Sequence, residues 1–192
     1  MSSVVISGDT SGTVTVAAPA VAGSNTLTLL AATATNSVNT RATAVASTSG
    51  TAIDFTGLPD WIKRITVQFQ GVSLSSTANI LVQLGTGSTS YTTSGYLSTA
   101  NAATSGGNSI GTSTAGFLVY VAGAARITSG QMVLTNITGN NWVASSVTKN
   151  DTGTVGFGGG DVSLGAVLTA VRITTTSTDT FDAGTVNILY EG

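Results

Sequence analysis

The stretch Ile65-Thr66-Val67-Gln68-Phe69-Gln70 decides the fold class, because apolar and polar residues alternate along it without a break. Successive side chains of a β-strand point to opposite faces, so Ile65, Val67 and Phe69 fall on one face and their polar neighbours on the other. This pattern is typical of an antiparallel strand with one face in a core and the other in water. We therefore expect an all-β protein.

Other segments on both sides of this stretch have the same character. The pattern predicts strands at residues 80–84, 117–121, 131–138, 142–148, 171–174 and 185–190, with a weaker one near 154–157 or 162–168. The segments 80–84 and 117–121 are apolar on both faces, which indicates central strands. About eight strands and no sustained helical period favour a β-sandwich, jelly-roll-like domain with very little helix.

Two glycine-rich segments are harder to interpret. Residues 85–116 consist almost entirely of small and polar residues, which is typical of a long functional loop, although part of the segment could form a threonine-rich edge hairpin. Gly156-Phe157-Gly158-Gly159-Gly160 has a glycine spacing reminiscent of nucleotide-binding loops, but its neighbours are β-like and no helix is expected after it. We interpret it as a flexible loop or bulge.

The first 50 residues differ from the rest of the chain, because they contain one acid, one base and no aromatic residue. Short alternating runs at 4–6, 13–16 and 26–30 predict strands too small to close a core, and an isolated hairpin of this kind is marginal in water. We expect residues 1–50 to form an attachment and stem segment completed by neighbouring copies or by a docking partner. Residues 51–192 would form the β-sandwich domain; a detached β-layer of that domain is the alternative for the first segment.

The chain of 192 residues carries little charge, with six basic and eight acidic residues and a formal net charge of −2. Net charge near zero favours contact between copies of a protein. Scattered basic residues argue against nucleic-acid binding, which needs clustered Lys and Arg. No apolar run approaches the length of a membrane-spanning helix, so we expect no membrane insertion.

The residue inventory argues against catalysis, since the chain has no histidine and no cysteine. A Ser–His nucleophile is impossible, and thiolate metal sites are excluded. Three acid pairs could formally act on glycosides: Asp54 with Asp60, Asp151 with Asp161, and Asp179 with Asp182. Each pair also fits a turn, which we favour. We predict no enzyme, no catalytic residue, no cofactor and no metal ligand.

Four aromatic residues are the candidates for contacts with other molecules. We expect Trp61 and Trp142 to be core residues or subunit-interface anchors. Tyr91 and Tyr96 lie in polar, glycine-rich surroundings and are the better candidates for ligand contacts, because aromatic rings in such loops stack on sugars. Packing against a neighbouring subunit explains these two tyrosines equally well.

Two stretches resemble proteins of tailed bacteriophages. ISGDTSGTVTV (residues 6–16) with its continuation APAVAGSNTLTL (residues 18–29) resembles a segment common in phage fibre and virion appendage proteins. TAIDFTGLPDWIKRITV (residues 51–67) is similar to virion proteins of such phages, often those of aquatic bacteria. Together the stretches cover the N-terminal third of the chain, and their low complexity supports the class of protein more than any particular member.

The resemblance implies a homotrimeric virion appendage with an N-terminal attachment segment and a C-terminal β-sandwich knob. Its partners would be capsid or tail proteins of the same virion, and it would be assembled in the host cytoplasm. The chain lacks the long shaft of a tail fibre, which favours a short fibre, a head fibre or a capsid decoration protein. A receptor- or glycan-binding adhesin, with a host-surface glycan as ligand, is the alternative.

Overall fold

The computed structural model describes residues 3–7, 13–17, 39–121, 123, 126–150 and 153–192. All regular structure in these residues is β-strand, and the chain divides into two units, residues 1–36 and 37–192. The first unit contains β1 (Ser3–Ser7) and β2 (Thr13–Ala17), which pair antiparallel with Val4 opposite Val16 and Ile6 opposite Val14. The third strand expected in this region, at 26–30, lies outside the described residues.

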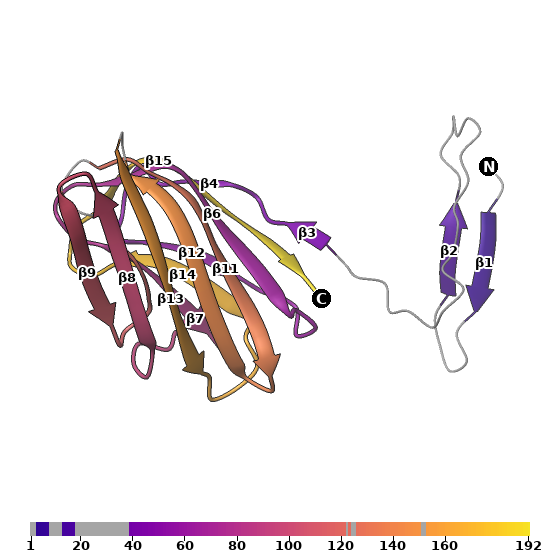
Figure 1. Cartoon of the computed structure of the whole chain (residues 1–192). Coiled ribbons are helices and arrows are strands. Elements are labelled where there is room, and N and C mark those ends of the chain that lie inside the picture. Colours follow the sequence, from indigo (N-terminus) through magenta and orange to yellow (C-terminus); the bar gives the residue numbers. More distant parts are fainter. Residues whose placement is uncertain (1–2, 8–12, 18–38, 122, 124–125, 151–152) are drawn as a thin grey trace. The chain divides into compact units, whose positions relative to one another are not determined.

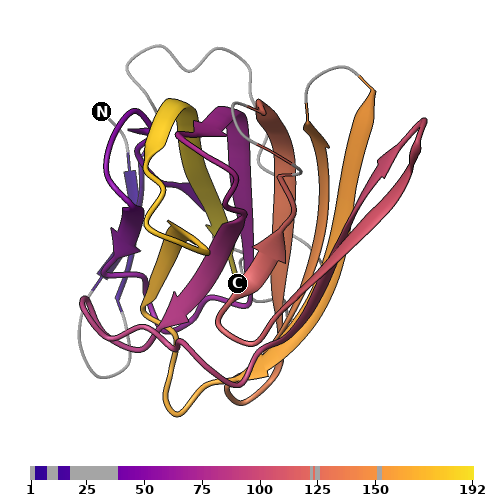
Figure 2. The same cartoon turned by 90° about the vertical axis from the view of Figure 1, so that its left-hand side faces the viewer.

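The second unit is a sandwich of two antiparallel sheets, which confirms the expected fold class (Figure 1). The larger sheet has the strand order β3-β15-β6-β11-β12-β13-β8-β9, with β4 also paired to β15, and the smaller has the order β10-β7-β14-β5. Figure 2 shows the two layers from the edge where β8 and β9 lie. The strands of this unit are β3 (Asn39–Arg41), β4 (Val45–Ala46), β5 (Ala52–Thr56), β6 (Arg64–Leu74), β7 (Ile80–Gly85), β8 (Leu97–Thr104), β9 (Gly107–Ser113), β10 (Phe117–Val119), β11 (Thr128–Thr138), β12 (Asn141–Asn150), β13 (Thr154–Ser163), β14 (Ala170–Thr175) and β15 (Phe181–Glu191).

The core lies between the two sheets and follows from the alternation seen in the sequence. In β6, Ile65, Val67 and Phe69 are buried, whereas Gln68 and Gln70 are exposed. The hairpin expected at 139–141 joins β11 to β12, and Gly139 takes the positive φ that its turn needs (φ 53°). Burial of these apolar side chains from both sheets is the main stabilising term of the unit.

The boundary between the units falls between residues 36 and 37, and not at residue 50 as the composition suggested. The residues we interpreted as a stem include β3 and β4, which pair with β15 and complete one edge of the larger sheet. Ser47 is fully buried there and its hydroxyl donates a hydrogen bond to the Ala183 carbonyl at 2.8 Å. The low hydrophobicity of residues 39–50 reflects an edge position and not a linker.

Two expectations about individual strands were wrong. Residues 156–160 form part of β13 and are not a loop. Their glycines are explained by packing, because β13 lies so close to β8 that a Cβ at Gly160 would be 2.4 Å from the Leu97 carbonyl oxygen. The strand at 117–119 is an edge strand of the smaller sheet, not a central one. It is apolar on both faces because β8 covers its second face, where Leu118 packs in a cluster with Ala100. The Leu118 N–H also donates a hydrogen bond of 2.9 Å to the Ser98 hydroxyl of β8.

Candidate functional site

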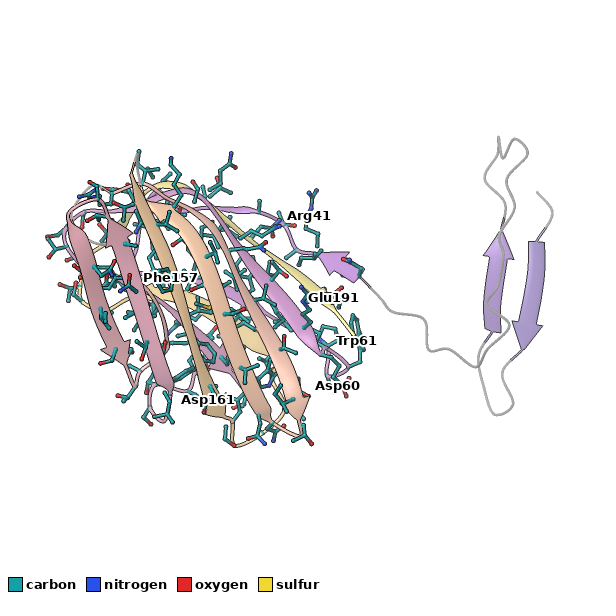
Figure 3. All side chains as sticks on the ribbon, in the orientation of Figure 1. Arg41, Asp60, Trp61, Phe157, Asp161 and Glu191 are labelled. Atoms are coloured by element: carbon teal, nitrogen blue, oxygen red, sulfur yellow. The ribbon has the colours of Figure 1, made fainter. Side chains whose placement is uncertain are left out.

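The outward face of the larger sheet carries an exposed apolar surface over β12 and β13. We call this surface the outer strip; its members are the outward-facing residues Val143, Ser145, Val147 and Lys149 of β12 and Val155, Phe157, Gly159 and Asp161 of β13. Their counterparts at alternate positions, such as Trp142 and Val162, point into the core. Figure 3 labels Phe157 and Asp161 on β13, with Asp161 nearer the lower end of the strand.

Two features of the strip depart from an ordinary solvated sheet face. The exposed positions of β12 and β13 include Val143, Val147, Val155 and Phe157, where polar residues are the norm. Gly159 has no side chain, so a shallow hollow of about 340 Å³ lies beside Phe157, lined also by Thr99, Asn101 and Ile110. The strip therefore presents an aromatic projection next to a depression.

The character of the face changes across the sheet. Strand pairing places Phe157 opposite Val147, Val147 opposite Gln131, Gln131 opposite Gln68, and Gln68 opposite Asn187. On the half over β12, β13, β8 and β9, exposed apolar side chains such as Phe157 stand among polar ones such as Asn101 and Thr99, whereas this row carries side-chain amides over β11, β6 and β15. A partner for the first half would have to cover its exposed apolar side chains.

The smaller sheet carries the other notable cluster, formed by Asp54, Arg172 and Tyr91. The Arg172 guanidinium donates two hydrogen bonds of 2.8 Å to the Asp54 carboxylate, and its carbon lies 4.0 Å from the centre of the Tyr91 ring. Partial burial and the neighbouring Asp54 charge raise the pKa of Tyr91, against the opposing effect of Arg172. Each charge in the cluster is paired, so the arrangement fixes the loop that carries Tyr91 against the sheet.

The structure separates the two tyrosines that the sequence suggested as ligand contacts. Tyr91 is partly exposed, and a ligand role for it stays a prediction. Tyr96 is a correction: it is 0% exposed, packs edge-on against Phe117 with ring centres 4.9 Å apart, and accepts a hydrogen bond of 2.8 Å from the Leu84 N–H. Burial raises the pKa of Tyr96 to about 12, although the Leu84 hydrogen bond opposes the shift. No face of this ring is open to a ligand.

The two tryptophans also differ. Trp142 is 3% exposed and belongs to the core, which was one of the two alternatives for it, so it offers no surface to a subunit. Trp61 is 37% exposed and lies near Tyr190, with ring centres 6.0 Å apart. The Lys63 N–H, two residues further along the chain, donates a hydrogen bond of 2.9 Å to the Glu191 carbonyl, so Trp61 lies near the end of β15 (Figure 3). A role for Trp61 in a subunit interface stays a prediction.

Besides Asp54, three acidic residues take part in structural contacts. Asp179 accepts a hydrogen bond of 2.8 Å from the Ala78 N–H, Asp182 accepts one from the Ser73 hydroxyl, and Glu191 pairs with Arg64 at 3.0 Å. Within the described ranges no three acidic residues gather where they could hold a metal ion. Asp151 lies outside the described residues, so its pairing with Asp161 is not seen.

Sequence reasoning missed the outer strip. In Trp142-Val143-Ala144-Ser145-Ser146-Val147, apolar residues occur at both odd and even positions, so the sequence does not show which face is buried. The signal that the sequence did offer was that residues 142–147 contain more apolar residues than one buried strand face can hold.

The described part of the chain contains no helix long and apolar enough to cross a membrane. No protein-family model, no curated protein and no solved structure matches the chain.

Proposed function

We propose that the chain is a non-enzymatic structural protein of a bacteriophage virion, a short fibre or decoration protein that assembles from copies of itself. The single observation that carries the assembly role is the outer strip, an exposed apolar surface on a rigid sheet. The virion setting, and the number of three copies, come from the resemblance of residues 6–29 and 51–67 to phage appendage proteins.

The physical argument for assembly is the cost of leaving this surface in water. Val147, Phe157 and Ile110 are exposed, and transfer of apolar area out of water contributes about 25 cal/mol per Å². Only 7% of the residues are charged, so little electrostatic repulsion opposes contact between copies. An exposed surface that extends over neighbouring strands supports a structural role.

The N-terminal hairpin supports an attachment role. The pairing of β1 with β2 places Val4, Ile6, Val14 and Val16 at positions that share one face of a two-stranded ribbon. A ribbon of two five-residue strands is marginal by itself in water. We propose that residues 1–36 gain their stability by docking onto a capsid or tail protein of the same virion.

Deleting residues 1–36 tests the attachment role. The truncated chain should keep the melting temperature of the full chain, because the sandwich has its own core, but it should no longer be incorporated into particles of the phage that encodes it. Quantitative immunoblotting of purified particles measures the incorporation. Normal incorporation of the truncated chain would contradict the proposal.

Binding of a host-surface glycan is the second candidate, and the cluster around Tyr91 is the observation that favours it. The Tyr91 ring is partly exposed, and Arg172 and Asp54 beside it offer hydrogen-bond groups to sugar hydroxyls. A Tyr91→Ala variant should then lose binding on a glycan array. Undiminished binding by this variant would rule out the site.

A further inference from the structure

The outer strip is built of four consecutive pairs of residues. β12 and β13 are in antiparallel register along their whole length, so each outward residue of one strand lies opposite an outward residue of the other. From one end of the strip to the other the pairs are Lys149 with Val155, Val147 with Phe157, Ser145 with Gly159, and Val143 with Asp161.

The two charged residues lie at opposite ends of this series. Lys149 and Asp161 are exposed, and neither has an ion-pair partner among the residues that the structure describes. The six steps along the strand from Val155 to Asp161 span about 20 Å, so the two charges of one copy cannot reach each other. Each end of the strip therefore carries one unpaired charge of opposite sign.

Because the two ends of the strip carry opposite charges, a second copy rotated by 180° can place its acidic end against the basic end of the first. When a second copy is rotated by 180° about an axis that lies in the face and runs across the strands, the order of its pairs is reversed. The second pair of one copy then meets the third pair of the other, so Phe157 faces Gly159. The first pair meets the fourth, so Lys149 lies one strand away from Asp161 of the second copy.

The shapes also match under this rotation. Phe157 is the largest side chain of the strip, and the hollow of about 340 Å³ beside it exists because Gly159 has no side chain. Two sheets that pack face to face lie about 10 Å apart with interdigitating side chains, which requires large residues to meet small ones. The rotation brings Phe157 of each copy over Gly159 of the other.

The neighbouring strands obey the same rule. By the pairing of β8 with β13, Leu97 shares a row with Asp161 and Ala103 shares a row with Val155. The rotation therefore places the exposed Leu97 over Ala103 of the second copy. Ile110 of β9 likewise meets Thr112. Each of the four strands thus has one larger residue that meets a smaller one, while Lys149 lies over Val143 and Val155 lies over Asp161 of the second copy.

From this self-complementarity we infer that a second copy of the chain covers the outer strip, in a twofold face-to-face contact made by β12, β13, β8 and β9. The inference rests on the proposed function insofar as copies assemble, and it adds the partner and the symmetry. A twofold contact predicts an even number of copies. A threefold appendage would contain it only as two trimers held face to face through this surface.

The size of the contact predicts its strength. Four strands at about 4.8 Å spacing and a length of about 20 Å give a projected footprint on the order of 400 Å² per copy. Standard stable interfaces bury about 800 Å² per partner, so this one belongs at the lower end. We expect the contact to form and dissociate reversibly in the micromolar range.

Sedimentation equilibrium of the full chain over a range of concentrations tests the inference. The wild-type mass should rise with concentration to an even multiple of the protomer. Val147→Asp should weaken this association at least about a hundredfold, since it buries a charge twice in one interface. Ile137→Asp is the matched control, because Ile137 and Val147 are both 62% exposed and Ile137 lies outside the strip; it should leave the association unchanged.

Charge reversal gives a sharper test that does not depend on apolar packing. Lys149→Asp alone and Asp161→Lys alone should each weaken association about tenfold, because two attractive pairs become repulsive. The double variant with both changes in one chain should restore it. A mixture of the two single variants should form mixed pairs, since one variant then supplies both acids and the other both bases.

The inference is overturned if the full chain stays monomeric or reaches only an odd number of copies across the micromolar range. It is equally overturned if Val147→Asp and Ile137→Asp behave alike, or if a glycan or another virion protein occupies the strip. In each of these cases, particles that still incorporate the chain through residues 1–36 would leave the proposed structural function standing.

Discussion

At the residue scale, the Tyr96 hydroxyl accepts a backbone hydrogen bond from β7 at a point where β10 no longer pairs with it. β10 pairs with β7 only as far as Val82, and beyond that point the Leu84 N–H has no strand partner on that side. The hydroxyl accepts this hydrogen bond, and the neighbouring Thr92 N–H donates to the Leu84 carbonyl at 2.9 Å. The buried tyrosine thereby satisfies a backbone N–H of β7 that no strand pairs with.

Removing this hydroxyl should be costly. Tyr96→Phe leaves the buried Leu84 N–H without an acceptor, and the free energy of unfolding should fall by about 1–3 kcal/mol. Tyr91→Phe is the control, because Tyr91 is partly exposed, so water can replace the contacts of its hydroxyl with the Ser88 carbonyl at 3.4 Å and with Asp54. Urea titration measures both variants, and equal stability of the two would contradict the role assigned to Tyr96.

The raised pKa of Tyr96 predicts a loss of stability in alkali. The pKa is about 12 in the folded chain, against an ordinary value of 10, so the contribution is complete below pH 10 and is lost as pH rises toward 12. In this window the unfolded chain releases a proton that the folded chain keeps. The free energy of unfolding should fall on the order of 2 kcal/mol, and the fall attributable to this residue should vanish in Tyr96→Phe.

At the element scale, β13 depends on glycine at specific positions. A Cβ at Gly160 would lie 2.4 Å from a backbone oxygen of β8, whereas a Cβ at Gly165 would meet nothing within 4 Å. Gly160→Ala should therefore lower the free energy of unfolding by about 1–3 kcal/mol, and Gly165→Ala should have little effect. Thermal unfolding of the pair measures the difference. Similar melting temperatures would show that β8 and β13 can separate at no cost.

The strands with clean alternation could be predicted from the sequence, and those rich in glycine could not. β6 and the β11–β12 hairpin follow from side-chain period and turn chemistry, which are local properties. β13 was interpreted as a loop because its glycines suggested flexibility. They are needed because β8 packs closely against β13, and this tertiary contact leaves no signal in the local sequence. Within residues 85–116, β8 and β9 form the edge hairpin that was the alternative to a loop. Tyr96, which precedes β8, is buried in the core.

The outer strip escaped sequence analysis for a related reason. Alternation identifies the buried face only when the other face is polar, and in β12 both faces contain apolar residues. The site is recognisable only once pairing shows that Val147 and Phe157 are opposite each other on the uncovered side. Surfaces built for contact are the places where the alternation rule is expected to fail.

At the scale of the whole molecule, the unit boundary makes a quantitative prediction. A chain that starts at residue 37 should melt at the same temperature as the full chain. A chain that starts at residue 51 loses β3, β4 and the buried Ser47, and its melting temperature should fall by several degrees. Differential scanning calorimetry compares the two, and equal melting temperatures would place the boundary at residue 50 after all.

The pairing of β3 with the end of β15 has a consequence for engineering. Asn39 lies opposite Glu191, so a peptide fused after Gly192 would emerge beside the place where the chain enters the sandwich from its N-terminal segment. The turn between β8 and β9, at residues 105–106, lies by the far edge strand of the same sheet. For display of a foreign epitope, insertion at that turn keeps the cargo away from the edge of the sheet where β3 begins, whereas a C-terminal fusion would place it at that edge.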